Sequence, residues 1–215
     1  MPENTLLNQL SCSIDLSKSK VVGYPSFIFL CGGPVPMDDG TAEFMSCRDI
    51  FLNHILCKNY PFSSQIILAE EIFTYFNHSS YKDLLTFEED LADLSSLTVI
   101  FSESPGSIAE FGSFSVLDSI RDKLLVVLHE NDTDKESFIW RGPAMHLIER
   151  AKKYSRENPI TIYNWKAKTR TPSHMNIEDF SDAEDLADMI NAFVKSRPKI
   201  VSFQPDDHGH IVTLP

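Results

Sequence analysis

The stretch LTVIFSESPGSIAEFGSF, residues 97–114, decides the fold. Its first five residues are a mostly apolar run with three β-branched side chains, Thr98, Val99 and Ile100, which predicts a buried strand. Pro105 and Gly106 then mark a turn. Residues 108–120 repeat apolar side chains at helical spacing. We therefore predict a strand, a loop and a helix, with the loop lying beyond the carboxyl end of the strand.

The same alternation extends in both directions along the chain. Strands are predicted at residues 26–33, 65–69, 123–129 and 160–165, and helices at 42–57, 81–94, 142–158 and 182–196. Helical segments between strands supply the long crossovers that parallel strands require. The expected fold class is α/β, a doubly wound and mostly parallel sheet flanked by helices, which binds ligands beyond the carboxyl ends of its strands.

The acidic helix expected at residues 81–94 has a predicted inner and outer face. Its apolar residues are expected to point inward and its acidic residues outward. The inward set is Leu84, Leu85, Phe87, Leu91 and Leu94, and the outward set is Glu88, Glu89, Asp90 and Asp93.

Length, composition and charge exclude several classes of protein. The 215 residues suffice for one domain with a sizeable core, and a hydrophobic content of 42% excludes a disordered chain. A net charge of −12 disfavours general binding to nucleic acid or anionic membranes. No apolar run approaches the roughly 20 residues of a membrane span, and the N-terminal segment does not resemble a secretion signal. We expect a cytoplasmic protein without membrane contact.

The expected organisation is an N-terminal arm (1–25), an α/β domain (26–198) and a C-terminal tail (199–215). Four cysteines fall within the first 57 residues without a CxxC pair, so reduced thiols are expected. The histidines form no HExxH motif, and no metal site is predicted.

Two glutamates in the deciding stretch are candidates for chemistry. Glu103 follows the strand, and Glu110 lies about one turn into the helix, which Ser104 could cap. Backbone N–H groups at a helix start can hold a phosphate. A carboxylate beside them could attack or shield the anomeric carbon of a nucleoside, because cleavage of its N-glycosidic bond develops positive charge there. The alternative is an ordinary loop whose glutamates are surface charges.

The first predicted strand ends in a second candidate, the turn CGGPVP at residues 31–36. Gly32 and Gly33 would let a ligand approach the backbone closely. Cys31 could be a nucleophile, although a cysteine at a buried strand end is more often a small core residue. The chain has no P-loop, no GxGxxG fingerprint and no GxSxG elbow.

Six segments together resemble one known family. They are FLCGG (29–33), AEEIF (69–73), LLTFEEDLAD (84–93), FSESPGSIAEFGSFS (101–115), KLLVV (123–127) and SFIWRGP (137–143). They resemble the nucleoside deoxyribosyltransferase-like effectors of bacterial retrons, over roughly residues 26–150. The resemblance implies a Rossmann-like fold and a toxin of antiphage defence. It also implies partners, a retron reverse transcriptase and its multicopy single-stranded DNA, in a complex or oligomer.

The resemblance also implies roles for individual residues. Glu110 matches the nucleophilic or charge-stabilising glutamate, and Glu103 fits an acid that orients the substrate. Glu70 and Glu71 lie in a matching acidic segment, without an assigned side of the crevice. The expected substrate-binding residues are Cys31, Gly32, Gly33, Asp93, Ser104, Pro105, Gly106 and Ser107. No cofactor is expected, and NAD⁺ is the expected substrate.

The activity that follows is an N-glycosidase that cleaves the base–ribose bond of a nucleotide. Three alternatives remain. One is transfer of a ribosyl or ADP-ribosyl group to nucleic acid or protein. Another is a nucleotide-binding module without turnover. The third is a phosphoribohydrolase of the lysine-decarboxylase-like type, whose PGGxGTxxE pattern is absent here.

The resemblance has one departure. Members of one branch carry a winged-helix-like C-terminal domain, whereas only residues 151–215 follow the matched region, so a shorter branch or an incomplete chain is expected. Residues 141–170 hold eight basic and two acidic residues, while residues 178–188 hold six acidic residues and no basic one. The basic stretch is either a solvated face or a contact for nucleic acid or a partner.

Overall fold

The computed structural model describes residues 21–36, 43–77, 81–170, 175–196, 200–205 and 211–213. By its internal contacts the chain divides into two units, residues 27–197 and the two chain ends, residues 1–26 with 198–215. The larger unit carries the deciding stretch and is described first.

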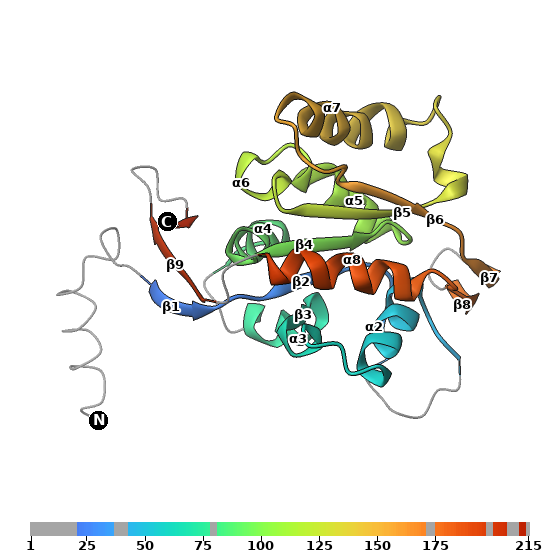
Figure 1. The fold of residues 1–215 in the computed structure, drawn as a ribbon, viewed down its shortest axis with the longest axis horizontal. Helices are drawn as coiled ribbons and strands as arrows, with labels where there is room; N and C mark the ends of the chain where they lie inside the picture. Colours follow the sequence, from blue (N-terminus) through green and yellow to red (C-terminus); the bar gives the residue numbers. More distant parts are fainter. Residues whose placement is uncertain are drawn as a thin grey trace. The chain divides into compact units, whose positions relative to one another are not determined.

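The larger unit is built on a five-stranded parallel sheet in the order β3-β2-β4-β5-β6. The strands are β2 (Ile28–Cys31), β3 (Ile66–Leu68), β4 (Leu97–Phe101), β5 (Leu124–His129) and β6 (Ile160–Tyr163). The chain passes from β2 to β3 on one side and then returns to place β4 on the other side of β2 (Figure 1). The carboxyl ends of β2 and β4 are therefore a topological switch point, where ligands bind in this architecture. The predicted α/β class is confirmed.

Alternating side chains of the strands build two hydrophobic layers. On β2, Ile28 and Leu30 belong to one layer, and Phe29 and Cys31 to the other. The first layer is covered by α2 (Cys47–Cys57) and α8 (Ala183–Lys195), and α8 crosses the sheet in Figure 1. The second layer includes residues of α4 (Leu84–Leu94), α5 (Pro105–Phe114), α6 (Asp118–Arg121) and α7 (Met145–Lys153). Strands covered on both faces explain the continuous apolar runs in the sequence.

Several elements were not predicted. Helix α3 (Ala69–Phe76) follows β3 without a loop, and a short hairpin joins β7 (Lys166–Arg170) to β8 (Met175–Asp179). Short 3₁₀ turns occupy Ser63–Gln65 and Glu130–Thr133. The helix expected to begin at residue 142 instead opens with a π-helical turn, Trp140–Ala144. Pro143 lies inside this turn and has no N–H to donate, which favours a departure from α-helical bonding.

Helix α4 agrees with the prediction in part. Phe87 is buried as expected, its ring contacts those of Phe76 and Tyr81, and Leu91 and Leu94 pack against the second layer. Leu85 is 53% exposed and Leu84 is 36% exposed, so neither of these two points inward as expected. Because Leu85 lies two residues before Phe87, it projects from nearly the opposite side of the helix. Glu88 is consequently turned partly inward.

The smaller unit contains a three-stranded antiparallel sheet in the order β1-β9-β10. Its strands are β1 (Val21–Pro25), β9 (Ile200–Pro205) and β10 (Ile211–Thr213). The segments expected as an arm and a tail thus include strands that pair with each other. The rest of both segments lies outside the described residues. Within the described part of the chain, no helix combines the length and apolar character of a membrane span.

Candidate active site

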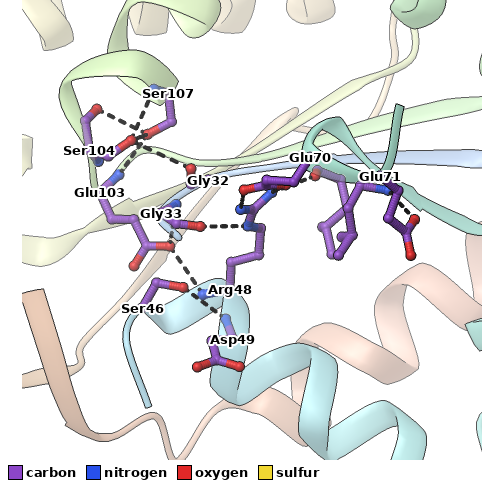
Figure 2. Close-up of polar contacts among 12 residues, drawn as sticks. Gly32, Gly33, Ser46, Arg48, Asp49, Glu70, Glu71, Glu103, Ser104 and Ser107 are labelled. Carbon is purple, nitrogen blue, oxygen red and sulfur yellow. Dashed lines mark hydrogen bonds and ion pairs between the residues drawn. The ribbon is translucent and has the colours of Figure 1, made fainter. Parts of the chain in front are cut away.

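Glu103 joins the two strand ends at the switch point. It follows β4, and its carboxylate accepts hydrogen bonds from the backbone N–H groups of Gly33 (2.9 Å), Cys47 (2.6 Å) and Arg48 (3.1 Å). Figure 2 shows Glu103 pointing from the start of the α5 loop toward Gly33 and the first turn of α2. Burial raises the pKa of Glu103, and the three N–H donors oppose that rise. The carboxylate is thus occupied by the backbone, which indicates a structural role and leaves the expected contact with substrate a prediction.

The SPGS loop forms the N-terminus of α5. Ser104 caps the helix by accepting the N–H of Ser107 at 3.2 Å, and the Ser107 hydroxyl accepts the N–H of Ser104 at 3.0 Å. Pro105 occupies the first helical turn, where its missing N–H costs nothing. The two serine hydroxyls, drawn in Figure 2, therefore stabilise the helix start, and Gly106 is exposed beside them.

The glycine pair after β2 is required by packing. A Cβ on Gly32 would lie 2.9 Å from Cδ of Arg48 and 3.0 Å from Cβ of Phe101. A Cβ on Gly33 would lie 2.7 Å from Cβ of Ser46. All three distances are shorter than ordinary carbon contacts. The two glycines therefore let α2 and β4 approach the turn closely.

Arg48 is fully buried and lies beneath this turn. Its Nε donates to the carbonyl of Gly33 at 2.8 Å, and one terminal nitrogen donates to the carbonyl of Leu30 at 3.0 Å. The guanidinium also forms a two-pronged ion pair with Glu70, the second residue of α3 (Figure 2). Glu71 points elsewhere and accepts the N–H of Leu68 at 3.0 Å. Of the two glutamates left open by the sequence, Glu70 is the one that faces the switch point.

Glu110 belongs to a cluster of carboxylates at this edge of the sheet. Among the residues that the structure describes, its Oε2 is one of few buried side-chain oxygens that accept no hydrogen bond. Burial raises the pKa of Glu110, while the charge of Arg48 lowers it. Glu88 on α4 has a pKa raised to about 7, by burial first and then by the charges of Glu110 and Glu70. The arrangement combines one carboxylate with a free oxygen and a second that titrates near neutrality.

Cys31 is the neighbour of Glu110 at the end of β2. Its thiol lies near the Glu110 carboxylate, and each group affects the pKa of the other. Burial, and next the negative charge of Glu110, raise the pKa of the Cys31 thiol far above its ordinary value. A protonated thiol donates a hydrogen bond but is a poor nucleophile. The geometry favours a positioning role for Cys31.

Asp93 does not belong to this group, and its expected contact with substrate stays a prediction. It lies near the C-terminus of α4 and forms an ion pair with Lys123, with 3.7 Å between Oδ1 and Nζ. Lys123 immediately precedes β5 and also donates to the carbonyl of Ser95, just before β4. Asp93 is therefore at the amino ends of the strands, opposite Gly33 and Glu103.

Three site residues escaped the sequence reasoning. Arg48 lies in a helix expected to be mostly apolar on one face, and a lone arginine there was the available signal. Glu88 was assigned to the outer face by its charge, although it lies four residues after Leu84 and three before Leu91 and so shares their side of the helix. Glu70 could not be distinguished from Glu71 without the position of Arg48.

A metal centre finds no support in the geometry. Across the described ranges, no group of three His, Cys, Asp or Glu side chains is placed to hold a metal ion. Cys31 and Cys47 are buried free thiols, and Cys57 is an exposed one.

The fold and the site together define a class, a doubly wound α/β protein with buried carboxylates at its switch point. The chain belongs to the family described as STM3845 retron effector protein, whose model matches residues 45–214. This match covers both the Arg48 region and the deciding stretch.

Two proteins of Escherichia coli are similar to this chain. The "Retron Ec86 putative ribosyltransferase/DNA-binding protein" is 36% identical over 122 residues, which cover 56% of this chain and 36% of that protein. The "Retron Ec73 putative ribosyltransferase/DNA-binding protein" is 27% identical over 148 residues, which cover 66% of this chain and 44% of that protein. The chain spans less than half the length of either relative.

Proposed function

We propose that this retron effector is an N-glycosidase that cleaves the bond between base and ribose in a nucleotide, with NAD⁺ as substrate. The observation that carries the proposal is Glu110, whose buried Oε2 accepts no hydrogen bond from the described residues. A buried carboxylate oxygen without a donor is costly, and such groups concentrate at functional sites. An oxocarbenium-like ribosyl centre is a species that a free carboxylate oxygen stabilises.

The first step is loss of the base. As the bond between C1′ and the pyridinium nitrogen of NAD⁺ breaks, its electron pair goes to that nitrogen, and nicotinamide leaves as a neutral molecule. Glu110 either bonds to C1′ or holds the developing cation as an ion pair. Burial raises the pKa of this carboxylate, and the charge of Arg48 and the Cys31 thiol oppose that rise. No proton donor is required for this leaving group.

The second step is attack of water on C1′. The oxygen of water bonds to C1′, and a proton of that water passes to a carboxylate. Where a bond between Glu110 and C1′ has formed, it breaks and its electron pair returns to Glu110. ADP-ribose results. Glu88 is suited to take the proton because a group with a pKa of about 7 is an efficient general base at neutral pH. Glu88 is therefore a second catalytic residue in this proposal.

The phosphates of the substrate would be held by the start of α5. The first turn of a helix offers backbone N–H groups and a positive dipole end to an anion. In this proposal Gly106 allows the phosphates to approach, and the glycine pair at 32–33 forms the opposing turn. Glu103 acts on the substrate site indirectly, because its carboxylate holds Gly33 against the start of α2. We assign it as a positioning residue.

Two features of the relatives support the wider proposal. Their names describe ribosyltransferases and place them in retrons. We propose that the chain is a toxin controlled within a retron complex by a reverse transcriptase and its multicopy single-stranded DNA. The same names favour one second candidate, transfer of the ADP-ribosyl group to nucleic acid or protein, which differs only in the acceptor that replaces water.

The test is incubation of the purified chain with NAD⁺ carrying a labelled adenosine part, alone and with the reverse transcriptase and its DNA. Free nicotinamide with soluble labelled ADP-ribose is expected. Nicotinamide release with label fixed to macromolecule would identify the transferase instead. Binding of NAD⁺ with no release in any combination would overturn the enzymatic proposal and leave a nucleotide-binding module.

A further inference from the structure

A cluster of basic residues lies at the end of α7, outside the candidate active site. Three cations surround the ring of Tyr154: the guanidinium carbons of Arg150 and Arg156 lie 4.6 Å and 5.7 Å from its centroid, and Nζ of Lys153 lies 5.5 Å away. Arg121 at the end of α6 also belongs to the cluster. Such a concentration of positive charge is unusual in a chain whose net charge is −12.

The cluster contains more donors than acceptors. Arg121 pairs with Asp118, and Arg156 pairs with Asp122. Within the described part of the chain, the Nε groups of Arg121 and Arg150 are buried without a hydrogen-bond partner. The Arg121 side chain is only 6% exposed. A buried guanidinium whose donors lack acceptors calls for an anion or another acceptor that completes it.

A groove of about 760 Å³ runs along these arginines. One wall carries Arg121, Arg150 and Arg156. The other is apolar and comes from the end of α8, with Met189, Ile190 and Phe193. Leu97, Leu124 and Pro159 also line the groove and lie at or just before the starts of β4, β5 and β6. The groove is therefore one strand length away from Glu103, roughly 16 Å for five residues.

We propose that this groove is a second binding site, for a phosphate-bearing ligand with an apolar or aromatic part. Guanidinium groups match phosphate oxygens in two-pronged geometry, and a phosphate supplies the acceptors that this cluster lacks. The apolar wall from α8 would then cover a base or a similar planar group. A free nucleotide and a nucleic-acid chain share this chemistry, and the experiment distinguishes them.

The experiment is calorimetric titration of the purified full chain with pyrophosphate at fixed ionic strength. Pyrophosphate has no glycosidic bond, so the result does not depend on the proposed cleavage activity. Saturable binding is expected, with a step at the groove that is separate from any binding at the start of α5. Arg150→Gln should weaken it by roughly tenfold or more, because it removes a charge-assisted donor. Arg156→Gln, at a half-exposed position that lines the groove, should weaken it several-fold and guards against misfolding of the first variant.

Lys152→Gln is the matched control. It removes the same charge from the same helix, but Lys152 is exposed and already pairs with Glu149 at 2.9 Å. Its affinity should stay within about twofold of the parent chain. Competition by ADP alone would identify a free nucleotide as the ligand, and stronger competition by a single-stranded oligonucleotide would identify a nucleic-acid phosphate. Absence of saturable binding at millimolar pyrophosphate, or equal weakening by the control, would overturn the proposal.

Discussion

The carboxylate of Glu103 accepts the backbone N–H of Arg48 at 3.1 Å, so the end of β4 is tied directly to the start of α2. The same carboxylate holds Gly33, and the three segments of the switch point thus meet on one side chain. No regular backbone pairing could join them, because each segment has left its strand or not yet completed its first helical turn.

Replacing Glu103 should therefore destabilise the fold. Glu103→Ala leaves three buried N–H groups without an acceptor, and we expect a loss of roughly 3 kcal/mol or more in the free energy of unfolding. Glu103→Gln keeps one acceptor oxygen and should cost less. Urea denaturation of both variants checks this order. Equal stability of Glu103→Ala and the parent chain would contradict the structural role.

The glycine pair gives a second prediction with an internal control. Gly33→Ala places a Cβ 2.7 Å from that of Ser46, and should destabilise the chain by roughly 1–3 kcal/mol. Gly112 lies within α5, and a Cβ there meets nothing within 4 Å. Gly112→Ala should stabilise by up to about 1 kcal/mol. Thermal unfolding of the two variants should shift in opposite directions, and a shift in the same direction would refute the packing argument.

The raised pKa of Glu88 predicts that the free energy of unfolding depends on pH. Its pKa is about 7 in the folded chain against 4.5 ordinarily, so its neutral form favours folding below pH 4.5 and this contribution is lost as the pH rises through 7. Glu88→Gln removes the charge and should stabilise the chain at pH 8 by at most about 3 kcal/mol. Near pH 4 the effect should vanish. Glu184→Gln, at an exposed position on α8, is the control, and a gain from Glu88→Gln that does not change with pH would contradict the assignment.

The same carboxyl should shape the pH dependence of catalysis. A general base works when ionised, so kcat/KM for NAD⁺ should rise with pH through about 7 and then level off. Glu88→Gln should lower kcat/KM at high pH and abolish its rise through pH 7. Initial rates of nicotinamide release between pH 5 and 9 measure it. A rate that falls as the pH rises through 7 would assign Glu88 as a proton donor instead.

The sequence predicted the parallel sheet because its strands are buried on both faces and read as uninterrupted apolar runs. The strand at 97–101 was placed correctly at both ends. The pairing of β1 with β9 was missed because it joins segments about 180 residues apart, which no local pattern reveals. The hairpin of β7 and β8 was missed because its polar residues were interpreted only as a basic stretch.

The candidate site was predicted in part, for a related reason. Glu103, Glu110 and the glycine pair stand next to strand ends, so topology alone brings them to one edge. Arg48, Glu70 and Glu88 lie on helices, where a side chain's direction depends on how the helix is rotated against the sheet. Glu88 was placed on the outer face of α4 by its charge, and Asp93 was assigned by its acidic neighbourhood although α4 carries it to the opposite edge.

The measurement that tests the central claim most directly compares nicotinamide release by the parent chain, Glu110→Gln and Glu184→Gln, with the retron partners present. Glu184→Gln makes the same change on α8, away from the carboxylate cluster. The account predicts at least a thousandfold slower release with Glu110→Gln, about 4 kcal/mol of barrier, and a parental rate with the control. A folded Glu110→Gln chain that releases nicotinamide at the parental rate would contradict it.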